Sequence, residues 1–297
     1  MSVRLAVFGN PVEHSLSPLI HQSFAKQEGR ALSYEKIRVT ESFATSAQAF
    51  FNPQEALAQA VGCNITVPCK LEAFAFAHEH TKRAARAGAV NTLYAERQAD
   101  GSLKFLGDNT DGGGLFLDLT RLNCPLKEAH VLILGAGGAT RGIIEPLLEP
   151  SVGLQSLTIT NRSVEKAELL VKSFSPAASA SAVKLHACAY ADLNAYQAEL
   201  QSPFTVVINA TSLSMQQLLP PLADSVYAQA SFVYDLFYTP QGQTIFTQKA
   251  EELGAKQVYD GLGMLVSQAA LSYQLWFKVL PDVTTTLNEL RSYLQNR

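Results

Sequence analysis

The sequence predicts an α/β protein made of two α/β units. Short apolar segments alternate with helical stretches along the first third of the chain, which is typical of parallel strands joined by helices on the faces of a sheet. The alternation starts again at residue 130, where a continuous apolar strand runs into a glycine-rich loop. A chain of 297 residues is long enough for two units, because a domain usually takes about 100 to 200 residues.

The first third carries the elements of the first unit. Apolar patterning predicts strands at residues 4–9, 34–39 and 63–67. Helices are expected at 17–29, after the second strand to about residue 60, and from Lys70 onward. Two further strands, at 89–96 and 103–109, flank Asp100-Gly101, a strong signal for a hairpin turn. We expect this hairpin to form an edge of the first sheet.

The second unit follows a helix expected at about 112–123. Its strands are expected at 130–134, 156–160, 183–187, 204–209 and 231–236, with helices between them. The small, polar stretch 173–182 is interpreted as a surface loop. Two helices, at 261–280 and 284–297, end the chain. The first of them should be buried on one side, because four apolar residues share a face: Leu265, Ala269, Tyr273 and Trp276.

Composition excludes several classes of protein. A formal net charge of −3 argues against the large basic surface that nucleic acid requires, so a small-molecule partner is expected. The four cysteines form neither a CxxC pair nor a metal-ligand cluster, so we expect no metal and reduced thiols in the cytoplasm. The chain start has no apolar signal-peptide core, and no uncharged apolar run approaches about 20 residues, so no membrane span is expected.

The loop of residues 135–140, GAGGAT, is close to the GxGxxG pattern of dinucleotide-binding sites. It follows a buried strand and opens a helix, where backbone N–H groups can bind a pyrophosphate. The alternative is a tight turn with no ligand. We expect cofactor contacts from five residues of this loop: Gly135, Ala136, Gly137, Gly138 and Ala139.

The end of the next strand predicts which dinucleotide binds. A site for NAD usually places Asp or Glu there, about 20 residues after the glycines, to bind the ribose 2′-hydroxyl. Here the strand is followed by Asn161, Arg162 and Ser163, with Lys166 soon after. A guanidinium can bind a 2′-phosphate that a carboxylate would repel, so we predict NADP. The alternative is that Arg162 and Lys166 are solvated charges at a helix start.

The segment NITVPCK, residues 64–70, predicts a short buried strand that stops at Pro68 and then presents Lys70. Lys70 either begins the next helix or takes part in chemistry, since the ends of strands carry the sites of many α/β proteins. Asn64 and Thr66 alternate with Ile65 and Val67, which predicts polar side chains on one face and apolar ones on the other.

Several motifs taken together resemble the shikimate dehydrogenase family along the whole chain. In order they are GNPVEHSLSP, NITVPCK, GAVNTL, GDNTDG, GAGGAT, TNRS, NATS, DLFY and DGLGMLVSQAA. The resemblance implies NADPH-dependent, reversible reduction of 3-dehydroshikimate to shikimate in the pathway to aromatic amino acids. It also implies a discontinuous substrate domain, residues 1–110 plus 261–297, a Rossmann-type NADP-binding domain, residues 111–260, and a cleft between them.

The resemblance implies a catalytic pair of Lys70 and Asp111. Hydride transfer to a carbonyl leaves negative charge on oxygen, which must be stabilised and protonated. Lys70 can do both, or only the first, and Asp111 would orient it and bind a substrate hydroxyl. From the residues alone, an Asp before GGGLFLDL is also an ordinary helix N-cap.

The remaining site residues also come from the resemblance. Ser15 and Ser17 would bind the substrate carboxylate, although Ser17 before Pro18 can equally cap a helix. Ring hydroxyls would contact Asn64, Thr66, Asn91 and Gln268, with Tyr238 beside the carboxylate, and the cofactor would also contact Thr211, Ser212 and Gly261. Each of these polar groups alone could instead satisfy a local backbone group.

Three positions depart from the family pattern. Cys69 replaces the usual aromatic residue before the lysine, and its thiol is either reactive or buried and inert. Ser214 stands where the family has glycine, which predicts a different backbone path beside the nicotinamide. Leu16 replaces a frequent lysine between the two serines, which would weaken the positive field for the carboxylate.

Two alternative functions are open to this sequence, a quinate/shikimate dehydrogenase and a non-catalytic dinucleotide-binding sensor. The sensor would be expected to have lost part of the catalytic pair, whereas Lys70 and Asp111 are both present. For assembly, a monomer and a homodimer both remain open.

Overall fold

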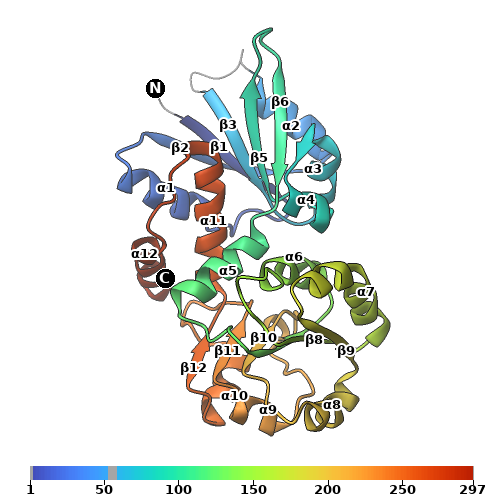
Figure 1. Cartoon of the computed structure of the whole chain (residues 1–297). Helices are drawn as coiled ribbons and strands as arrows, with labels where there is room; N and C mark the ends of the chain where they lie inside the picture. The colour runs from blue at the N-terminus through green and yellow to red at the C-terminus, as the bar shows by residue number, and fades with distance from the viewer. Residues whose placement is uncertain (1–2, 53–58, 297) are drawn as a thin grey trace. The chain divides into compact units, whose positions relative to one another are not determined.

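The computed structural model describes residues 3–52 and 59–296 and divides the chain into two compact units (Figure 1). Unit 1 comprises Met1–Gly114 and Val266–Leu290, and unit 2 comprises Leu115–Leu265 and Arg291–Arg297. Each unit has its own sheet, so the predicted α/β class with two α/β units is confirmed. The cleft expected between them stays a prediction.

Unit 1 contains a six-stranded mixed sheet in the order β2-β1-β3-β5-β6-β4. Its strands are β1 (Val3–Gly9), β2 (Leu32–Arg38), β3 (Gln59–Ile65), β4 (Glu79–His80), β5 (Thr92–Arg97) and β6 (Leu103–Asp108). Its helices are α1 (Ser17–Gln27), α2 (Phe43–Phe51), α3 (Lys70–Phe76) and α4 (Lys82–Ala87), with the larger parts of α11 (Leu262–Phe277) and α12 (Val283–Gln295). Strand β1 pairs in parallel with β2 and β3, whereas β5 is antiparallel to β3 and β6.

Strand β1, between β2 and β3, is buried on both faces, as expected for a strand covered by helices on either side. Ala6 and Phe8 belong to a core with α2 and α3, in which Phe8 meets Phe43 edge to face at 5.5 Å between ring centroids. Leu5 and Val7 point the other way, into a core with Trp276 of α11. The Trp276 Nε1 also donates to the Leu93 carbonyl oxygen at 2.8 Å, which fastens α11 to the sheet.

Unit 2 contains a six-stranded parallel sheet in the order β12-β11-β10-β7-β8-β9. Its strands are β7 (His130–Leu134), β8 (Ser156–Thr160), β9 (Lys184–Cys188), β10 (Val206–Asn209), β11 (Phe232–Asp235) and β12 (Gln257–Tyr259). Its helices are most of α5 (Asp111–Arg121), α6 (Gly138–Leu147), α7 (Val164–Ala180), α8 (Leu193–Leu200), α9 (Asp224–Gln229) and α10 (Ile245–Glu252), with the short 3₁₀ turns η1 (Tyr190–Asp192) and η2 (Ser214–Gln216).

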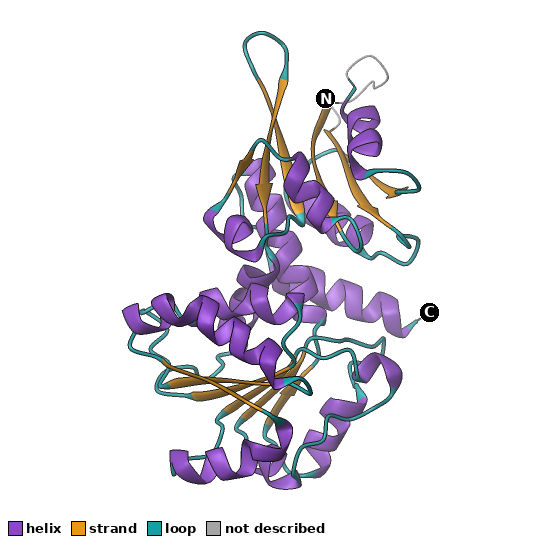
Figure 2. Cartoon of the chain, turned by 90° about the vertical axis from the view of Figure 1, so that its right-hand side faces the viewer, coloured by secondary structure: helices purple, strands orange, loops and turns teal. Residues whose placement is uncertain are grey.

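Helices cover both faces of this parallel sheet (Figure 2). Val131 and Ile133 of β7 pack into a core with α5, α6 and α7. Leu132 and Leu134 face the opposite core, with α8, α9 and α10. Burial on both faces explains why these strands are continuous apolar runs in the sequence.

Four expectations about elements were wrong. Residues 173–180 are helical because Leu170, Phe174 and Ala178, spaced by four, bury one face of α7, even with Pro176 inside the helix. The helix expected to reach residue 60 ends at Phe51: Asn52 is extended, as a residue before proline prefers, and residues 53–58 lie outside the described residues. Strand β3 ends at Ile65, two residues early, and Val67 is 68% exposed.

The fourth wrong expectation was that the β5–β6 hairpin forms the edge of the sheet. The two-residue strand β4 pairs in parallel with β6 and takes that place, while the hairpin projects beyond its neighbours (Figure 1). Strands β4 and β12 were missed, because two or three residues are too short to show a period in the sequence.

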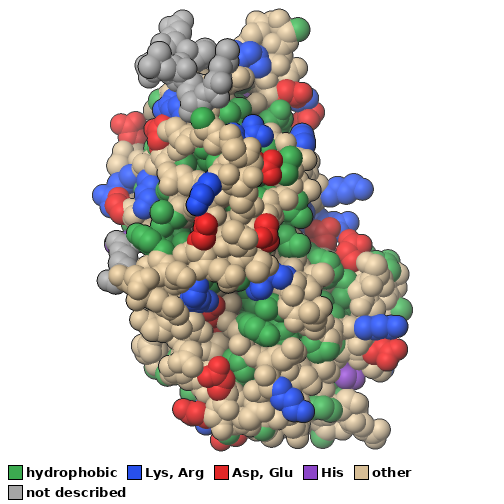
Figure 3. Space-filling model, turned by 90° about the vertical axis from the view of Figure 1, so that its left-hand side faces the viewer, with side chains coloured by type: hydrophobic (Ala, Val, Ile, Leu, Met, Phe, Trp, Pro, Cys, Tyr) green, Lys and Arg blue, Asp and Glu red, His purple; other side chains and the backbone are tan. Residues whose placement is uncertain are grey.

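The surface agrees with the near-neutral composition. On the face drawn in Figure 3, Lys and Arg side chains are interspersed with Asp and Glu. Among the described helices, none is both long enough and apolar enough to cross a membrane.

Candidate functional site

In unit 1, the structure brings together Lys70 and Asp111, the two residues predicted to be catalytic. Each is the first residue of its helix, α3 and α5, and the Lys70 Nζ lies 2.6 Å from the Asp111 Oδ2. The side chains are 29% and 23% exposed, so the ion pair is partly shielded and still open to solvent. An ammonium and a carboxylate in this arrangement can stabilise a developing oxyanion and exchange a proton with it.

The side-chain amide of Asn91, the residue directly before β5, holds this pair in place. The Asn91 Nδ2 donates to the Asp111 Oδ1 at 2.7 Å, so both oxygens of Asp111 are hydrogen-bonded. The Asn91 Oδ1 accepts from the backbone N–H of Thr110 at 2.9 Å. Gln268 of α11 joins through its Oε1, which lies 3.4 Å from Asn91 Nδ2 and 3.3 Å from Thr110 Oγ1. Predicted residues from four separate segments of the chain therefore meet here, namely Lys70, Asn91, Asp111 and Gln268.

The segment before Asp111 is anchored by a buried carboxylate, Asp108, at the end of β6. Arg83 of α4 donates to both of its oxygens, and Thr81 donates to one of them at 2.6 Å. Burial alone would raise the pKa of Asp108, but the hydrogen bonds and charge of Arg83 outweigh it and hold the pKa below its usual value. The ionised Asp108 also accepts from the backbone N–H of Asn109 at 2.8 Å, which fixes the turn into α5.

Asn64 was predicted to contact substrate, but its polar atoms are used within the protein. It is 6% exposed, and its Oδ1 accepts from the Tyr34 hydroxyl at 2.8 Å and pairs with the His21 Nε2 at 3.0 Å. Its Nδ2 donates to the Ser272 and Thr92 hydroxyl oxygens at 3.0 and 3.2 Å. Thr92 in turn donates to the Asn91 Oδ1 at 2.9 Å, so Asn64 is connected to the Lys70–Asp111 pair.

His21 is neutral in this network. Burial lowers its pKa to about 3, partly offset by the hydrogen bond with Asn64. Its ring stacks on Tyr34, with 4.8 Å between centroids and 8° between planes. Sequence reasoning missed Thr92, Thr110 and Ser272 as members of the network. The signal for Ser272 was its spacing of four from Gln268 on one helix.

The two serines predicted to bind a carboxylate lie at the start of α1. The Ser15 Oγ lies 3.1 Å from the Ser17 Oγ and accepts from the Ser17 backbone N–H at 3.3 Å. The N-cap position belongs to Leu16, with no side-chain cap, so Ser17 does not cap the helix. Thr66, half-buried, follows β3, and its backbone N–H donates to the Phe8 carbonyl oxygen at 2.8 Å.

In unit 2, a cavity of about 640 Å³ lies at the ends of β7, β8 and β10. It is lined by all but one of the predicted cofactor residues, namely Gly135, Ala136, Gly137, Gly138, Ala139, Asn161, Arg162, Ser163, Lys166, Thr211 and Ser212, together with residues such as Tyr190 and Leu213. The missing one is Gly261, where a Cβ would lie 2.1 Å from the Leu236 carbonyl oxygen, so this glycine is explained by packing.

The glycine loop fits a pyrophosphate. Gly135 has φ +100°, which an L side chain rarely adopts. A Cβ at Gly137 or Gly138 would meet no heavy atom within 4 Å, so open space lies where a ligand would sit. Helix α6 begins at Gly138 without a side-chain cap, which leaves its first N–H groups available to an anion.

Positive charge lines the same cavity. Arg162 and Lys166 are exposed, and within the described ranges neither forms an ion pair with a carboxylate. They are therefore available to a phosphate. Tyr238, in the loop after β11, does not line this cavity, and burial raises the pKa of its hydroxyl.

Cys69 is buried, at 1% exposure. Burial and then the charge of Glu72 raise the pKa of its thiol, which disfavours the reactive thiolate. The structure therefore supports the inert alternative. Within residues 3–52 and 59–296, no cluster of three or more His, Cys, Asp or Glu side chains could hold a metal ion.

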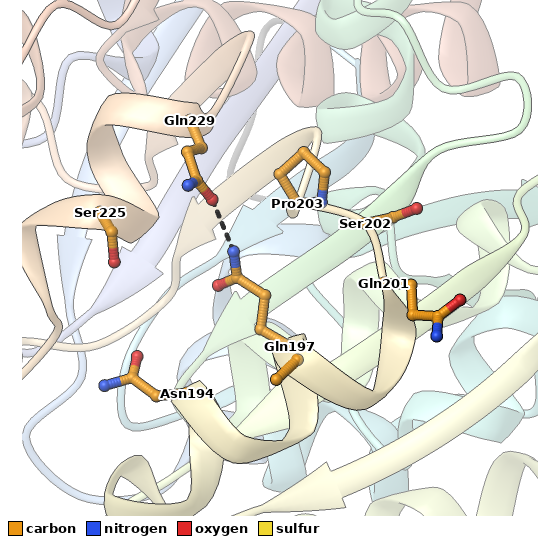
Figure 4. Close-up of a pocket in the computed structure, with 8 residues that line it drawn as sticks. Asn194, Gln197, Gln201, Ser202, Pro203, Ser225 and Gln229 are labelled. Atoms are coloured by element: carbon orange, nitrogen blue, oxygen red, sulfur yellow. Dashed lines mark hydrogen bonds between the residues drawn. The ribbon is translucent and has the colours of Figure 1, made fainter.

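A second hollow of about 420 Å³ lies between α8 and α9 of unit 2 (Figure 4). Carboxamides dominate it: Gln197 donates to the Gln229 Oε1 at 2.7 Å, with Asn194 and Gln201 nearby. Its lining has no ionisable side chain and none of the predicted site residues. It therefore offers no acid–base chemistry.

Comparisons with known proteins agree with this geometry. Three family models match: the shikimate dehydrogenase substrate binding domain at residues 7–93, shikimate / quinate 5-dehydrogenase at 118–220, and the shikimate 5'-dehydrogenase C-terminal domain at 261–291. A shikimate dehydrogenase (NADP(+)) from Vibrio atlanticus (strain LGP32) is 42% identical over 98% of both chains.

Solved structures also resemble the chain over nearly its full length. An Ael1 enzyme from Pseudomonas putida is 38% identical, with a TM-score of 0.82 over 97% of both chains. A shikimate 5-dehydrogenase from Thermus thermophilus, in complex with NADP(H) and shikimate, is 29% identical, with a TM-score of 0.77 over 98% of this chain and 99% of that one.

Replacing Arg83 by Met should destabilise the protein in a pH-dependent way. The pKa of Asp108 is lowered in the fold, so its stabilising effect is present above the unfolded pKa of about 3.9 and is lost as pH falls through the folded value. Arg83→Met should cost about 1 to 3 kcal/mol at pH 7, a range that allows for the partial exposure of Arg83, and less at pH 2, as the pH falls through the folded pKa of Asp108. Urea unfolding at both pH values measures this, with Arg97→Met as the surface control. An equal loss at both pH values would contradict it.

Proposed function

This chain belongs to the shikimate dehydrogenase family, and we propose that it catalyses the reversible, NADPH-dependent reduction of the C3 carbonyl of 3-dehydroshikimate to shikimate. The observation that carries the proposal is the Lys70–Asp111 pair, 2.6 Å between Nζ and Oδ2 and held by Asn91. We propose unit 1 as the substrate-binding unit and unit 2 as the nucleotide-binding unit.

When bound, NADPH supplies hydride from its nicotinamide ring. The residues of this chain must therefore stabilise and protonate the negatively charged substrate oxygen that hydride transfer leaves. Lys70 is placed to stabilise the oxyanion by its positive charge and to donate a proton to it. Asp111 holds the Lys70 ammonium by an ion pair and, with Asn91 hydrogen-bonded to its other oxygen, stays in a single orientation.

The other predicted residues fall into two groups. Ser15 and Ser17 offer hydroxyls for the substrate carboxylate, and Thr66, Asn91 and Gln268 offer polar groups for ring hydroxyls. We assign Asn64 to positioning, because a direct contact with substrate would require it to give up one of its buried hydrogen bonds. The contacts of Tyr238 with the carboxylate and of Gly261 with the cofactor stay predictions.

In the nucleotide site, Gly135 to Ala139 and the start of α6 would hold the pyrophosphate. Arg162 and Lys166 would bind the 2′-phosphate. Asn161 donates to the Ser163 carbonyl oxygen at 2.9 Å, which shapes the turn that presents Arg162. A cytoplasmic location is also proposed, supported by four free cysteines. Monomer and homodimer remain open.

The direct test of the function is turnover of 3-dehydroshikimate with NADPH or NADH, followed by the absorbance of the reduced cofactor. We expect rapid turnover with NADPH and weak turnover with NADH, because Arg162 and Lys166 recognise the 2′-phosphate. Oxidation of quinate with NAD or NADP tests the broader activity. A protein that does not oxidise NADPH in the presence of 3-dehydroshikimate would refute the proposal.

Removing either member of the pair should lower turnover. In Lys70→Ala and Asp111→Ala we expect kcat to fall by ~10² to 10⁴. Each variant lacks a side chain that transfers a proton or stabilises charge in the transition state. The control is Lys104→Ala, which breaks another 2.6 Å lysine–carboxylate pair in the same unit, with Glu79. A rise in KM with kcat unchanged would make Lys70 and Asp111 binding residues only.

Arg162→Ala should weaken NADPH selectively. A charge-assisted hydrogen bond contributes about 1.5 to 3 kcal/mol, which corresponds to a loss of about 10- to 150-fold in NADPH affinity. NADH affinity should stay nearly unchanged, since NADH lacks the 2′-phosphate. Fluorescence titration measures both, with Lys172→Ala, an exposed residue of α7 outside the cavity, as the control. An equal loss for both nucleotides is the contrary result.

A further inference from the structure

The loop after β10 forms one wall of the nucleotide cavity, but little of it is buried. Ala210, Thr211, Ser212, Leu213, Gln216 and Leu219 line the cavity. Within residues 211–219, Ser214 is the only buried residue, at 0% exposure, whereas Met215 and Leu218 are 65% and 51% exposed. Apolar burial therefore contributes little to holding this loop in one conformation.

Ser214 joins the loop to the last residue of β11. Its Oγ donates to the Asp235 Oδ2 at 2.6 Å and accepts from the Asn209 Nδ2 at 3.1 Å. Both partners are fully buried. A glycine here would have no hydroxyl and would leave this carboxylate with one donor fewer. Ser214 is not among the described residues with positive φ, so a serine fits the backbone without strain.

The contact extends to the cavity wall through Asn209. The Asn209 Oδ1 accepts from the Thr211 backbone N–H at 3.1 Å and from the Thr211 hydroxyl at 2.7 Å. The Nδ2 of the same carboxamide donates to Ser214 and to the Asp235 Oδ1, at 3.1 Å in each case. A shift of Ser214 would therefore remove one of the two acceptors that hold the Asn209 carboxamide, to which Thr211 of the cavity wall is bonded.

We propose that Ser214 is a positioning residue for the cofactor. Its hydroxyl, bonded to Asp235, holds residues 211–219 in the conformation that forms the wall of the cavity. Ser214 itself does not line the cavity, so it acts through Thr211 and its neighbours. The proposal rests on the proposed function, since it takes NADPH as the occupant of the cavity.

The test compares Ser214→Ala with a matched variant, Thr244→Val. Thr244 donates to the same Asp235 Oδ2, also at 2.6 Å, but it is the N-cap of α10 and does not line the cavity. Both variants remove one hydrogen bond from one carboxylate, and only Ser214→Ala loosens the loop. Three quantities are measured: melting temperature, NADPH affinity by fluorescence titration, and hydrogen exchange of residues 211–219.

We expect Ser214→Ala to weaken NADPH binding by about tenfold, the loss that one charge-assisted hydrogen bond would give, and to speed exchange in residues 211–219. The KM for 3-dehydroshikimate should not change. Thr244→Val should lower the melting temperature at least as much, because it also removes the helix cap, yet change NADPH affinity by less than about twofold.

Two results would overturn the proposal. One is unchanged exchange of the loop in Ser214→Ala, and the other is an equal loss of NADPH affinity in both variants, which would indicate general destabilisation. If the parent protein does not bind NADPH, the proposed function fails. The exchange of residues 211–219 then decides by itself whether Ser214 holds the loop.

Discussion

Unit 1 depends on keeping the Asp111 carboxylate between two donors. Lys70, the first residue of α3, approaches one oxygen, and Asn91, the residue before β5, approaches the other. A carboxylate with both oxygens bonded has one orientation, and that orientation places the Lys70 ammonium. The surrounding structure serves this constraint: Asp108 fixes the turn before Asp111, and Asn64 with Thr92 fixes Asn91 from its buried side. Catalysis of this type needs such preorganised charge.

Much of this arrangement could be predicted from the sequence because local patterns reflect local physics. Apolar runs mark the buried strands of unit 2, and the glycines of residues 135–138 mark a turn with open space beside it. The pairing of Lys70 with Asp111 was different, since nothing in the residues themselves connects positions 41 apart. Only the resemblance of several motifs to one family suggested it.

The sequence alone did not reveal most of the hydrogen-bond partners of the buried polar side chains. The family resemblance implied that Asn64 contacts substrate, and this stays a prediction, whereas nothing in the sequence indicated that Tyr34 and His21 would bond to its oxygen. Likewise the serines and alanines of 173–180 suggested a loop, although the spacing of Leu170, Phe174 and Ala178 was that of a helix. That prediction followed the small, polar composition of the segment, whereas the spacing of its apolar residues indicated the helix correctly.

The neutral His21 has a consequence for the movement of protons. Its Nε2 and the Tyr34 hydroxyl both act as donors toward one carboxamide oxygen, so the Asn64 amide cannot turn over. Carboxamides do not accept and release protons near neutral pH, and two of them, Asn64 and Asn91, separate His21 from Asp111. The network therefore separates the Lys70–Asp111 pair from His21 on its buried side. The side of Lys70 that remains open to exchange of a proton is the partly exposed one, since its side chain is 29% exposed.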